Sequence, residues 1–453
     1  QSDIKTAFLN ALLEETVFAK PVYDHIHILK LLWKSLTDPA QRAKVGDQIR
    51  ALRNGGVLRL LKAIYGLKQA PRAWWKQLHA FLKGLGFVAN PRDVCFYVLK
   101  LAGGAFVFLL LYVDDILIAA TSAALVTMYV DLIAKRFKIS AQGELKCYLG
   151  FDIEIDLSRR RVSLSMAEYM VRAFKRFNMV VKQSVVTPLM DGIQKALEIA
   201  DSGDGDDSLA RDFEYREKIG VALYMMICMR PDVSYCVQLL ARYSTKCNRI
   251  ACAGLTHLLH FLYNTRFTKL TLGGMIALIR AFSDSDYAGD SITRRSVAAF
   301  IMYLGIGPVS WGSKQHKYVT LSTGEAEFIS LDGAARAIVA LRWLLKETGI
   351  EQIITKYSSA LFTDSTVAEA LCSNMSVSDK IKHVATKFNY ARELQEQGVI
   401  CVQRVDTKLN PADGGTKVQS RVIFQQIAPL MLGNAELVRT TKRTLTKVSD
   451  DFA

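Results

Sequence analysis

The sequence has no apolar run long enough to cross a lipid bilayer, which requires about 20 consecutive apolar residues in a helix. The most apolar stretch, residues 105–120, is interrupted by Asp114 and Asp115. We therefore expect no membrane segment. The first residue is Gln rather than Met, and no basic and apolar leader precedes the rest of the sequence. We expect an intracellular, non-secreted protein, and the start indicates a fragment of a longer chain.

The eight cysteines include no Cys-x-x-Cys pair, which favours a reducing compartment over a disulfide framework. One alternative is a zinc site made of Cys247, Cys252, His257 and His260. Its spacing is poor for zinc, and the two histidines lie three residues apart in a predicted amphipathic helix. We therefore favour an ordinary helix face.

Internal repeats and low-complexity tracts are absent, whereas basic residues are in excess. The 453 residues carry a net charge of +15, and half of them are apolar. That length predicts two to four domains with ample cores. Lys and Arg are spread along the chain, which favours a polyanionic partner such as a nucleic acid; the alternative is charge that only maintains solubility.

The most informative motif is Tyr-Val-Asp-Asp at residues 112–115, between two short predicted strands. Two adjacent carboxylates in an apolar segment repel each other and are costly to bury, unless a hard cation such as Mg²⁺ joins them. The alternative is a hairpin turn whose Asp114 and Asp115 face water. A third carboxylate would complete a two-metal site, and Asp3 is the best candidate.

Three segments, residues 3–9, 62–74 and 112–115, resemble in this order the reverse transcriptase of copia-type long-terminal-repeat retrotransposons. The run from Tyr65 to Trp74 is the most specific part of the match. The resemblance implies that the metal-binding carboxylates of the polymerase palm are Asp3, Asp114 and Asp115. It also implies that Phe8 is the aromatic gate against ribonucleotides and that Gln69 contacts the nucleotide.

Other residues have weaker assignments. Phe8 could instead be an ordinary core residue, and Arg72, Lys62 and Lys68 are either phosphate contacts or a solvated basic loop. Residues 143–151 resemble the primer-gripping hairpin of the same family, which implies that Tyr148, Leu149 and Gly150 contact the nucleic acid. A plain strand and turn would look much the same.

A second set of acids lies further along the chain. Asp284 and Asp364 end predicted strands, Glu325 opens a predicted helix, and Asp413 follows Asn-Pro-Ala. Three antiparallel strands followed by alternating helix and strand predict an RNase H-like α/β domain. Each acid also has an ordinary explanation as a helix cap, a first-turn charge or a turn residue.

Residues 280–433 resemble the RNase H domain of copia-type elements, and by that match Asp284, Glu325, Asp364 and Asp413 are its metal ligands. Asp286 and Glu327 are close competitors, and we rank Asp284 over Asp286 and Glu325 over Glu327. The implied substrate is the RNA strand of an RNA–DNA hybrid, recognised through its 2′-hydroxyls. A basic face for that hybrid, or a merely solvated surface, is predicted at Lys382, His383 and Lys387.

The predicted fold is α+β and multidomain, a truncated right-hand polymerase followed by a connection and an RNase H-like domain. The expected parts are a palm and thumb with most of the fingers missing, a linker and connection, the RNase H-like domain, and a basic tail: residues 1–190, 191–274, 275–433 and 434–453. The acidic, glycine-rich residues 201–207 read as a linker.

The resemblance implies two Mg²⁺ ions per site, with Mn²⁺ as an alternative. Implied partners are an RNA template, a DNA primer, RNA–DNA hybrid, dNTPs and other Gag and Pol segments, in cytoplasmic virus-like particles and also in the nucleus. The chain departs from the family pattern at the missing fingers, in the long stretch 25–54 and at Gly324. Three hypotheses remain: an active reverse transcriptase with RNase H, a truncated relic in which only the nuclease works, and a non-catalytic nucleic-acid-binding protein.

Overall fold

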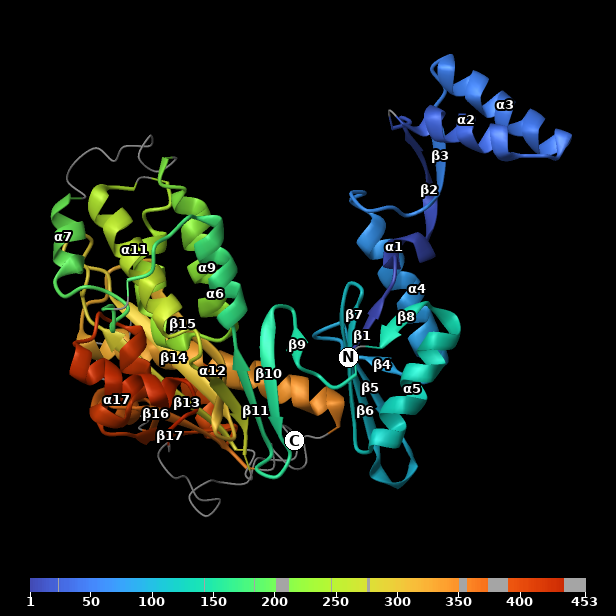
Figure 1. Cartoon of the computed structure of the whole chain (residues 1–453). Coiled ribbons are helices and arrows are strands. Elements are labelled where there is room, and N and C mark those ends of the chain that lie inside the picture. The colour runs from blue at the N-terminus through green and yellow to red at the C-terminus, as the bar shows by residue number, and fades with distance from the viewer. Residues whose placement is uncertain are drawn as a thin grey trace. The chain divides into compact units, whose positions relative to one another are not determined.

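The computed structural model describes residues 1–435, apart from residues 23, 142, 183, 201–211, 246, 275–277, 350–356 and 374–389. The chain divides into two compact units, Gln1–Glu144 and Leu145–Ala453, and both mix helices with sheets (Figure 1). The fold is therefore α+β and multidomain, as predicted. Within the described residues, no helix is both long and apolar enough to span a membrane.

The first unit is built on a six-stranded sheet in the order β4-β5-β6-β7-β1-β8. Its core joins the sheet to α4, whose residues Trp74, Leu78 and Leu82 recur every four positions and so form one buried helix face. Tyr129 and Ile133 bring α5 into the same core. The elements are β1 (Ser2–Ile4), α1 (Ala7–Asn10), α4 (Ala70–Gly84), β4 (Val88–Ala89), β5 (Phe96–Lys100), β6 (Phe106–Tyr112), β7 (Asp115–Ala120), α5 (Ala123–Arg136) and β8 (Ile139–Ala141).

A two-stranded ribbon and a helical hairpin complete this unit. Strand β2 (Leu12–Ala19) pairs antiparallel with β3 (Leu58–Lys62), and α2 (His25–Ser35) and α3 (Pro39–Arg53) lie between them in the chain. Helix α3 begins with Asp38 as its N-cap and proline in its first turn, which is a strong start signal.

The second unit begins with a four-stranded sheet in the order β12-β11-β10-β9 and a group of helices. Its core contains residues from α6, α9, α10 and α11, and also Val297, Phe424 and Ala428 from the RNase H-like part. One core therefore contains residues from both sides of positions 190 and 274, and the division that we expected there stays a prediction. The elements are β9 (Cys147–Tyr148), β10 (Phe151–Asp156), β11 (Arg161–Ser165), α6 (Ala167–Arg176), α7 (Ile193–Ala200), α9 (Tyr215–Cys228), η2 (Pro231–Val233), α10 (Ser234–Ala241), α11 (Arg249–Asn264) and β12 (Leu270–Gly273).

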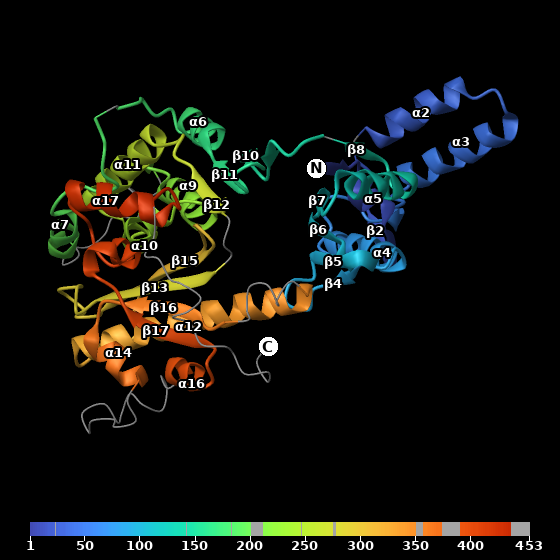
Figure 2. The same ribbon diagram turned by 90° about the horizontal axis from the view of Figure 1, so that it is seen from below.

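The rest of the unit is a five-stranded sheet in the order β15-β14-β13-β16-β17, with helices on both faces (Figure 2). The first three strands are antiparallel, and β16 and β17 add in parallel. Residues of α12 pack against one face, and residues of α17 pack against the other. This is the RNase H-like arrangement that the sequence predicts. Its elements are β13 (Ile279–Asp286), β14 (Val297–Leu304), β15 (Gly307–Gln315), α12 (Thr323–Thr348), β16 (Ser359–Thr363), α14 (Thr366–Ser373), α16 (Tyr390–Glu396), β17 (Ile400–Arg404), η4 (Thr407–Leu409), η5 (Pro411–Gly415) and α17 (Arg421–Met431).

Candidate active sites

Two parallel strands carry acids to one edge of the five-stranded sheet. The register places Phe282 of β13 beside Phe362 of β16, so Asp284 and Asp364, two residues further on, emerge next to each other. Glu327 of α12 joins them, and the three side chains have carboxylate oxygens within 4.8 Å of one another. We call Asp284, Glu327 and Asp364 the nuclease triad. It is the one such group of three or more His, Cys, Asp or Glu side chains among the described residues.

The helix start explains why Glu327, and not Glu325, reaches the triad. Ser322 is the N-cap of α12 and accepts a hydrogen bond from the Glu325 backbone N–H. The Glu325 carboxylate turns back and accepts from the Leu321 backbone N–H at 2.6 Å, as in a capping box. The structure thus uses Glu325 as a helix cap and places Glu327, which we ranked second, in the group of three acids; the ranking itself stays a prediction.

The triad has the chemistry of a magnesium site. Burial, followed by the charges of Asp284 and Asp364, raises the pKa of Glu327 to about 9. Burial also raises the pKa of Asp284 to about 7. Glu327 Oε2 is buried and has no hydrogen-bond partner. A buried carboxylate oxygen without a partner is costly, and a hard divalent cation would satisfy it. The residues present therefore fit Mg²⁺.

Neighbouring hydroxyls orient two of the triad carboxylates. Thr416 Oγ1 donates to Asp284 Oδ2 at 2.7 Å, and Thr407 Oγ1 donates to Asp364 Oδ2 at 2.8 Å. Both threonines come from the segment after β17, so the last part of the chain completes the site. Such outer contacts fix the direction of ligand atoms.

Asp413, the fourth predicted acid, lies near the triad but outside it. Its Oδ1 is 2.6 Å from Lys417 Nζ, and its Oδ2 accepts from Gln419 Nε2 at 2.9 Å. Burial alone would lower the pKa of Lys417, but the hydrogen bond and charge of Asp413, with the charges of Asp284 and Asp286, raise it. Asp286 ends β13, and burial raises its pKa too.

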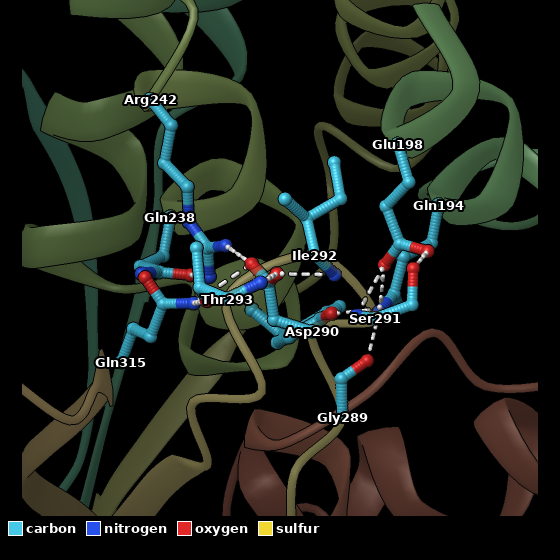
Figure 3. Close-up of polar contacts among 11 residues, drawn as sticks. Gln194, Glu198, Gln238, Arg242, Gly289, Asp290, Ser291, Ile292, Thr293 and Gln315 are labelled. Carbon is cyan, nitrogen blue, oxygen red and sulfur yellow. Dashed lines mark hydrogen bonds and ion pairs between the residues drawn. The ribbon is translucent and has the colours of Figure 1, made fainter. Parts of the chain in front are cut away.

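The loop that follows β13 is tied to the connection helices. Asp290 is the centre of these contacts (Figure 3). Its Oδ1 accepts from the backbone N–H groups of Ile292 and Thr293 at 3.2 and 2.8 Å. Its Oδ2 accepts from Arg242 at 3.0 Å and from Gln315 at 2.8 Å. Arg242 immediately follows α10, so this one carboxylate joins the loop to that helix and to β15.

Helix α7 holds the same loop from another side (Figure 3). Gln194 Nε2 donates to the Gly289 carbonyl at 2.9 Å, and the Ser291 hydroxyl donates to Glu198. Tyr235 of α10 donates to Gln194 Oε1 at 2.8 Å. We call the contacts of Gln194, Glu198, Arg242 and Asp290 the loop clasp. It shows that residues assigned to the connection position a loop beginning directly after Asp286.

The predicted polymerase acids come together in the first unit. Asp3 and Asp115 are direct partners in the antiparallel pairing of β1 and β7, and Asp114 O accepts from Ile4 N at 2.8 Å. Burial, then the charges of Asp114 and Asp3, raises the pKa of Asp115. Asp114 and Asp115 lie at the turn between β6 and β7, and Asp3 lies beside them on β1, but the carboxylate oxygens of the three do not form a group within 4.8 Å.

The turn that carries these acids has a strained residue. Val113 has a φ of +58°, which is unfavourable for a β-branched side chain. The Val113 carbonyl accepts a hydrogen bond of 2.6 Å from the Trp74 indole N–H. Trp74 is buried in α4, so the helix fixes the turn.

Phe8 and Tyr65 form an aromatic pair beside the acids. Phe8 is buried in the core, and its ring centroid lies 4.6 Å from that of Tyr65. Just over half of Tyr65 is exposed. Removal of the rest from water, followed by the negative charges of Asp114 and Asp3, raises the pKa of its hydroxyl. Sequence reasoning missed Tyr65 as an individual site residue, although it starts the most specific part of the family match.

A pocket of about 190 Å³ lies beside the start of α4. Gln69 and Arg72 line it, together with Glu14 and Lys76, which form an ion pair of 2.8 Å. Lys62 and Lys68 are exposed but do not line this pocket.

The predicted primer-gripping residues form a tight hairpin in the second unit. Tyr148 ends β9 and is buried, and Leu149 and Gly150 both have positive φ, at +52° and +85°. This is the pattern of a type I′ turn, which suits a two-residue hairpin. The Leu149 carbonyl accepts from Tyr224 of α9 at 3.0 Å, so the turn is fixed by a connection helix.

Comparison with known proteins identifies the chain. Residues 42–191, which include Asp114 and Asp115 but not Asp3, match the family model "Reverse transcriptase (RNA-dependent DNA polymerase)". The Pol polyprotein of transposon TNT 1-94 from Nicotiana tabacum is 29% identical over 425 residues. That of transposon RE2 from Arabidopsis thaliana is 33% identical over 395 residues. The chain belongs to the reverse-transcriptase family of copia-type retrotransposon Pol polyproteins.

This reverse-transcriptase region spans only part of those relatives. The match covers 94% of this chain and 30% of the tobacco polyprotein, and 87% of this chain and 26% of the RE2 polyprotein. The RNase H1 structure from Halobacterium salinarum is 18% identical, covers 31% of this chain and 94% of that one, and superposes with a TM-score of 0.23.

Two groups of residues named in the sequence analysis remain, the alternative zinc ligands and a predicted basic face. The zinc alternative is not favoured: the His257 ring contacts the Thr187 carbonyl at 2.9 Å, and the buried Cys247 and Cys252 sulfurs lie 3.6 Å apart. These side chains do not form a metal-holding group among the described residues. Lys382, His383 and Lys387 lie outside the described residues.

Proposed function

We propose that this chain is the reverse-transcriptase and ribonuclease H region of a retrotransposon Pol polyprotein, and that hybrid cleavage is the activity the isolated chain performs. The observation that carries the proposal is the nuclease triad, in which buried Asp284 and Glu327 meet Asp364 at a sheet edge. Burying several carboxylates together has no structural benefit, whereas a phosphodiester-cleaving metal site requires it.

The residues of this chain supply the geometry of the cleavage site. Asp284, Glu327 and Asp364 would hold Mg²⁺, which when bound activates water and stabilises the leaving 3′-oxygen. The hydroxyls of Thr416 and Thr407 fix the orientation of the Asp284 and Asp364 carboxylates through hydrogen bonds. The RNA strand of a hybrid would be distinguished from DNA by its 2′-hydroxyls. The net charge of +15 favours binding of the substrate backbone.

The polymerase site has weaker support. Asp3 on β1 pairs with Asp115 beside the turn that also carries Asp114, and Gln69 and Arg72 line a pocket suited to a nucleotide contact. The carboxylates are not gathered as closely as the nuclease triad. We therefore propose that primer extension by this chain is weak or absent.

The test uses the purified full chain with Mg²⁺ and an RNA–DNA hybrid labelled on the RNA strand. We expect cleavage by the wild type, loss of cleavage in Asp364→Asn, and wild-type cleavage in Asp191→Asn, which changes an exposed acid of the same unit. Lack of cleavage by the wild type, or cleavage that persists in Asp364→Asn, would contradict the proposal. Primer extension on an RNA template is measured in parallel with Asp115→Asn as control, and robust extension would contradict the polymerase part alone.

A further inference from the structure

The fourth acid of the nuclease site is already bound to a cation that belongs to the chain. Asp413 is buried, and both of its carboxylate oxygens have partners, Lys417 Nζ at 2.6 Å and Gln419 Nε2 at 2.9 Å. Glu327 differs, because its Oε2 is buried without a partner. The site therefore has one open part, the nuclease triad, and one part closed by an ammonium group.

The Lys417 ammonium also acts on the other acids of the site. Its charge interacts with those of Asp284, Asp286 and Glu327 as well as Asp413. It stabilises a group of carboxylates that would otherwise repel one another. In the metal-free chain, Lys417 takes the part of a counter-ion.

Lys417 is nevertheless not locked in place. Its side chain is 47% exposed, whereas that of Asp413 is 8% exposed. A lysine carries a compact charge on a flexible four-carbon stem, so the ammonium can move to solvent while Asp413 stays where it is. Gln419 would hold the Asp413 segment during this movement, because its Nε2 donates to the Asp413 carbonyl at 2.8 Å.

We infer that Lys417 competes with a divalent cation for Asp413, so that a cation can use this fourth carboxylate only when the ammonium has moved away. This inference rests on the proposed nuclease function. Two positive charges cannot share one carboxylate without strong repulsion. Lys417 thus sets the divalent-ion concentration at which the site fills, and it acts through Asp413 as a positioning residue.

Divalent-ion binding to the full chain tests the inference directly. Mn²⁺ is titrated by calorimetry into chains that carry Asp114→Asn and Asp115→Asn, so that binding reports on the nuclease site. The variants are Lys417→Met, Lys417→Arg, and Lys175→Met, which removes an exposed positive charge from α6. Asp364→Asn identifies the binding that belongs to the nuclease triad. Circular dichroism verifies that each variant is folded.

We expect Lys417→Met to bind Mn²⁺ at least about threefold more tightly, the effect of removing a partly exposed charge pair. Its melting temperature without metal should be lower, because the acids lose their counter-ion. Lys417→Arg, which keeps the charge, should bind no more tightly than the wild type, and Lys175→Met should be unchanged. In hybrid cleavage, Lys417→Met should reach half-maximal rate at a lower Mg²⁺ concentration.

Unchanged or weaker Mn²⁺ binding in folded Lys417→Met would overturn the inference, as would equal tightening in Lys417→Arg or Lys175→Met. Failure of the proposed function has a different signature, because the wild type would then show no Mn²⁺ binding that Asp364→Asn removes.

Discussion

The indole N–H of Trp74 donates a 2.6 Å hydrogen bond to the carbonyl of Val113, and Val113 has a φ of +58°. The contact joins the most specific sequence motif of the chain, on α4, to the turn that carries Asp114 and Asp115. A left-handed valine costs roughly 1–2 kcal/mol relative to its usual conformation. The hydrogen bond offsets part of that strain, and the turn retains a conformation that the sequence Tyr-Val-Asp-Asp would not adopt alone.

Replacing Val113 by glycine should therefore stabilise the first unit. We expect Val113→Gly to raise the free energy of unfolding by about 0.5–1 kcal/mol, because glycine adopts positive φ without steric cost. Hydrogen exchange of residues 106–120 measures the change within this unit. Val94→Gly is the matched control, since Val94 is also exposed but does not have positive φ, and it should not stabilise. Stabilisation by both variants, or by neither, would show that the turn is unstrained.

Glu325 and Glu327 should differ sharply in function although they are two residues apart. We expect Glu327→Gln to abolish hybrid cleavage, because it removes a charged triad ligand. Glu325→Gln should cleave normally and lose at most about 1 kcal/mol of stability, the usual range for a helix-start contact. Cleavage rates at saturating Mg²⁺ and urea unfolding give the two readouts. The reverse pattern would support our original ranking.

The metal-free chain should lose stability as the pH rises. Burial and the charges of Asp284 and Asp364 raise the pKa of Glu327 in the folded chain from its ordinary 4.5 to about 9, so the unfolded chain releases this proton more readily. Stability from this group is complete below about pH 4.5 and falls as the pH rises toward 9. In EDTA at pH 8, Glu327→Gln should be more stable than the wild type by a few kcal/mol.

That advantage should shrink toward pH 5, because the Glu327 carboxyl of the unfolded chain then approaches its own pKa and releases its proton less completely. The measurement is the free energy of unfolding between pH 5 and 9, with Glu347→Gln in α12 as the control. A pH-independent difference would mean that Glu327 does not titrate in this window.

The RNase H-like part should not fold as an independent domain. Its α17 residues Phe424 and Ala428 share a core with the connection helices, and the loop clasp adds polar contacts. We expect residues 145–435 to unfold cooperatively, whereas residues 275–435 should be degraded rapidly in limited proteolysis. A protease-resistant shorter fragment with a cooperative melting curve would contradict this expectation.

The sequence indicated where Asp284 and Asp364 would lie, because the end of an apolar strand can be recognised in a sequence. Asp284 and Asp364 follow apolar strands, and parallel neighbours bring their ends to one edge. The choice between Glu325 and Glu327 could not be made from the sequence, because it depends on helix phase. Both lie near the start of α12, and only the capping contact to Leu321 shows which one turns away.

The division of the chain was less predictable, because a hydrophobic pattern shows which face is buried but not what covers it. The Phe424 ring, for example, packs 5.5 Å from that of Phe261, which lies far away in the chain. The role of Lys417 was hidden for a similar reason. It depends on the short helix η5, which places the lysine one turn after Asp413.

The clasp around Asp290 has a consequence for judging copies of this element in a genome. The presence of its acids alone does not establish that such a nuclease is intact. Here a missense change at Arg242 or Gln194, or a small deletion in α7, would release the loop beside an unaltered set of acids. Copies should therefore be sorted by whether the connection helices survive as well.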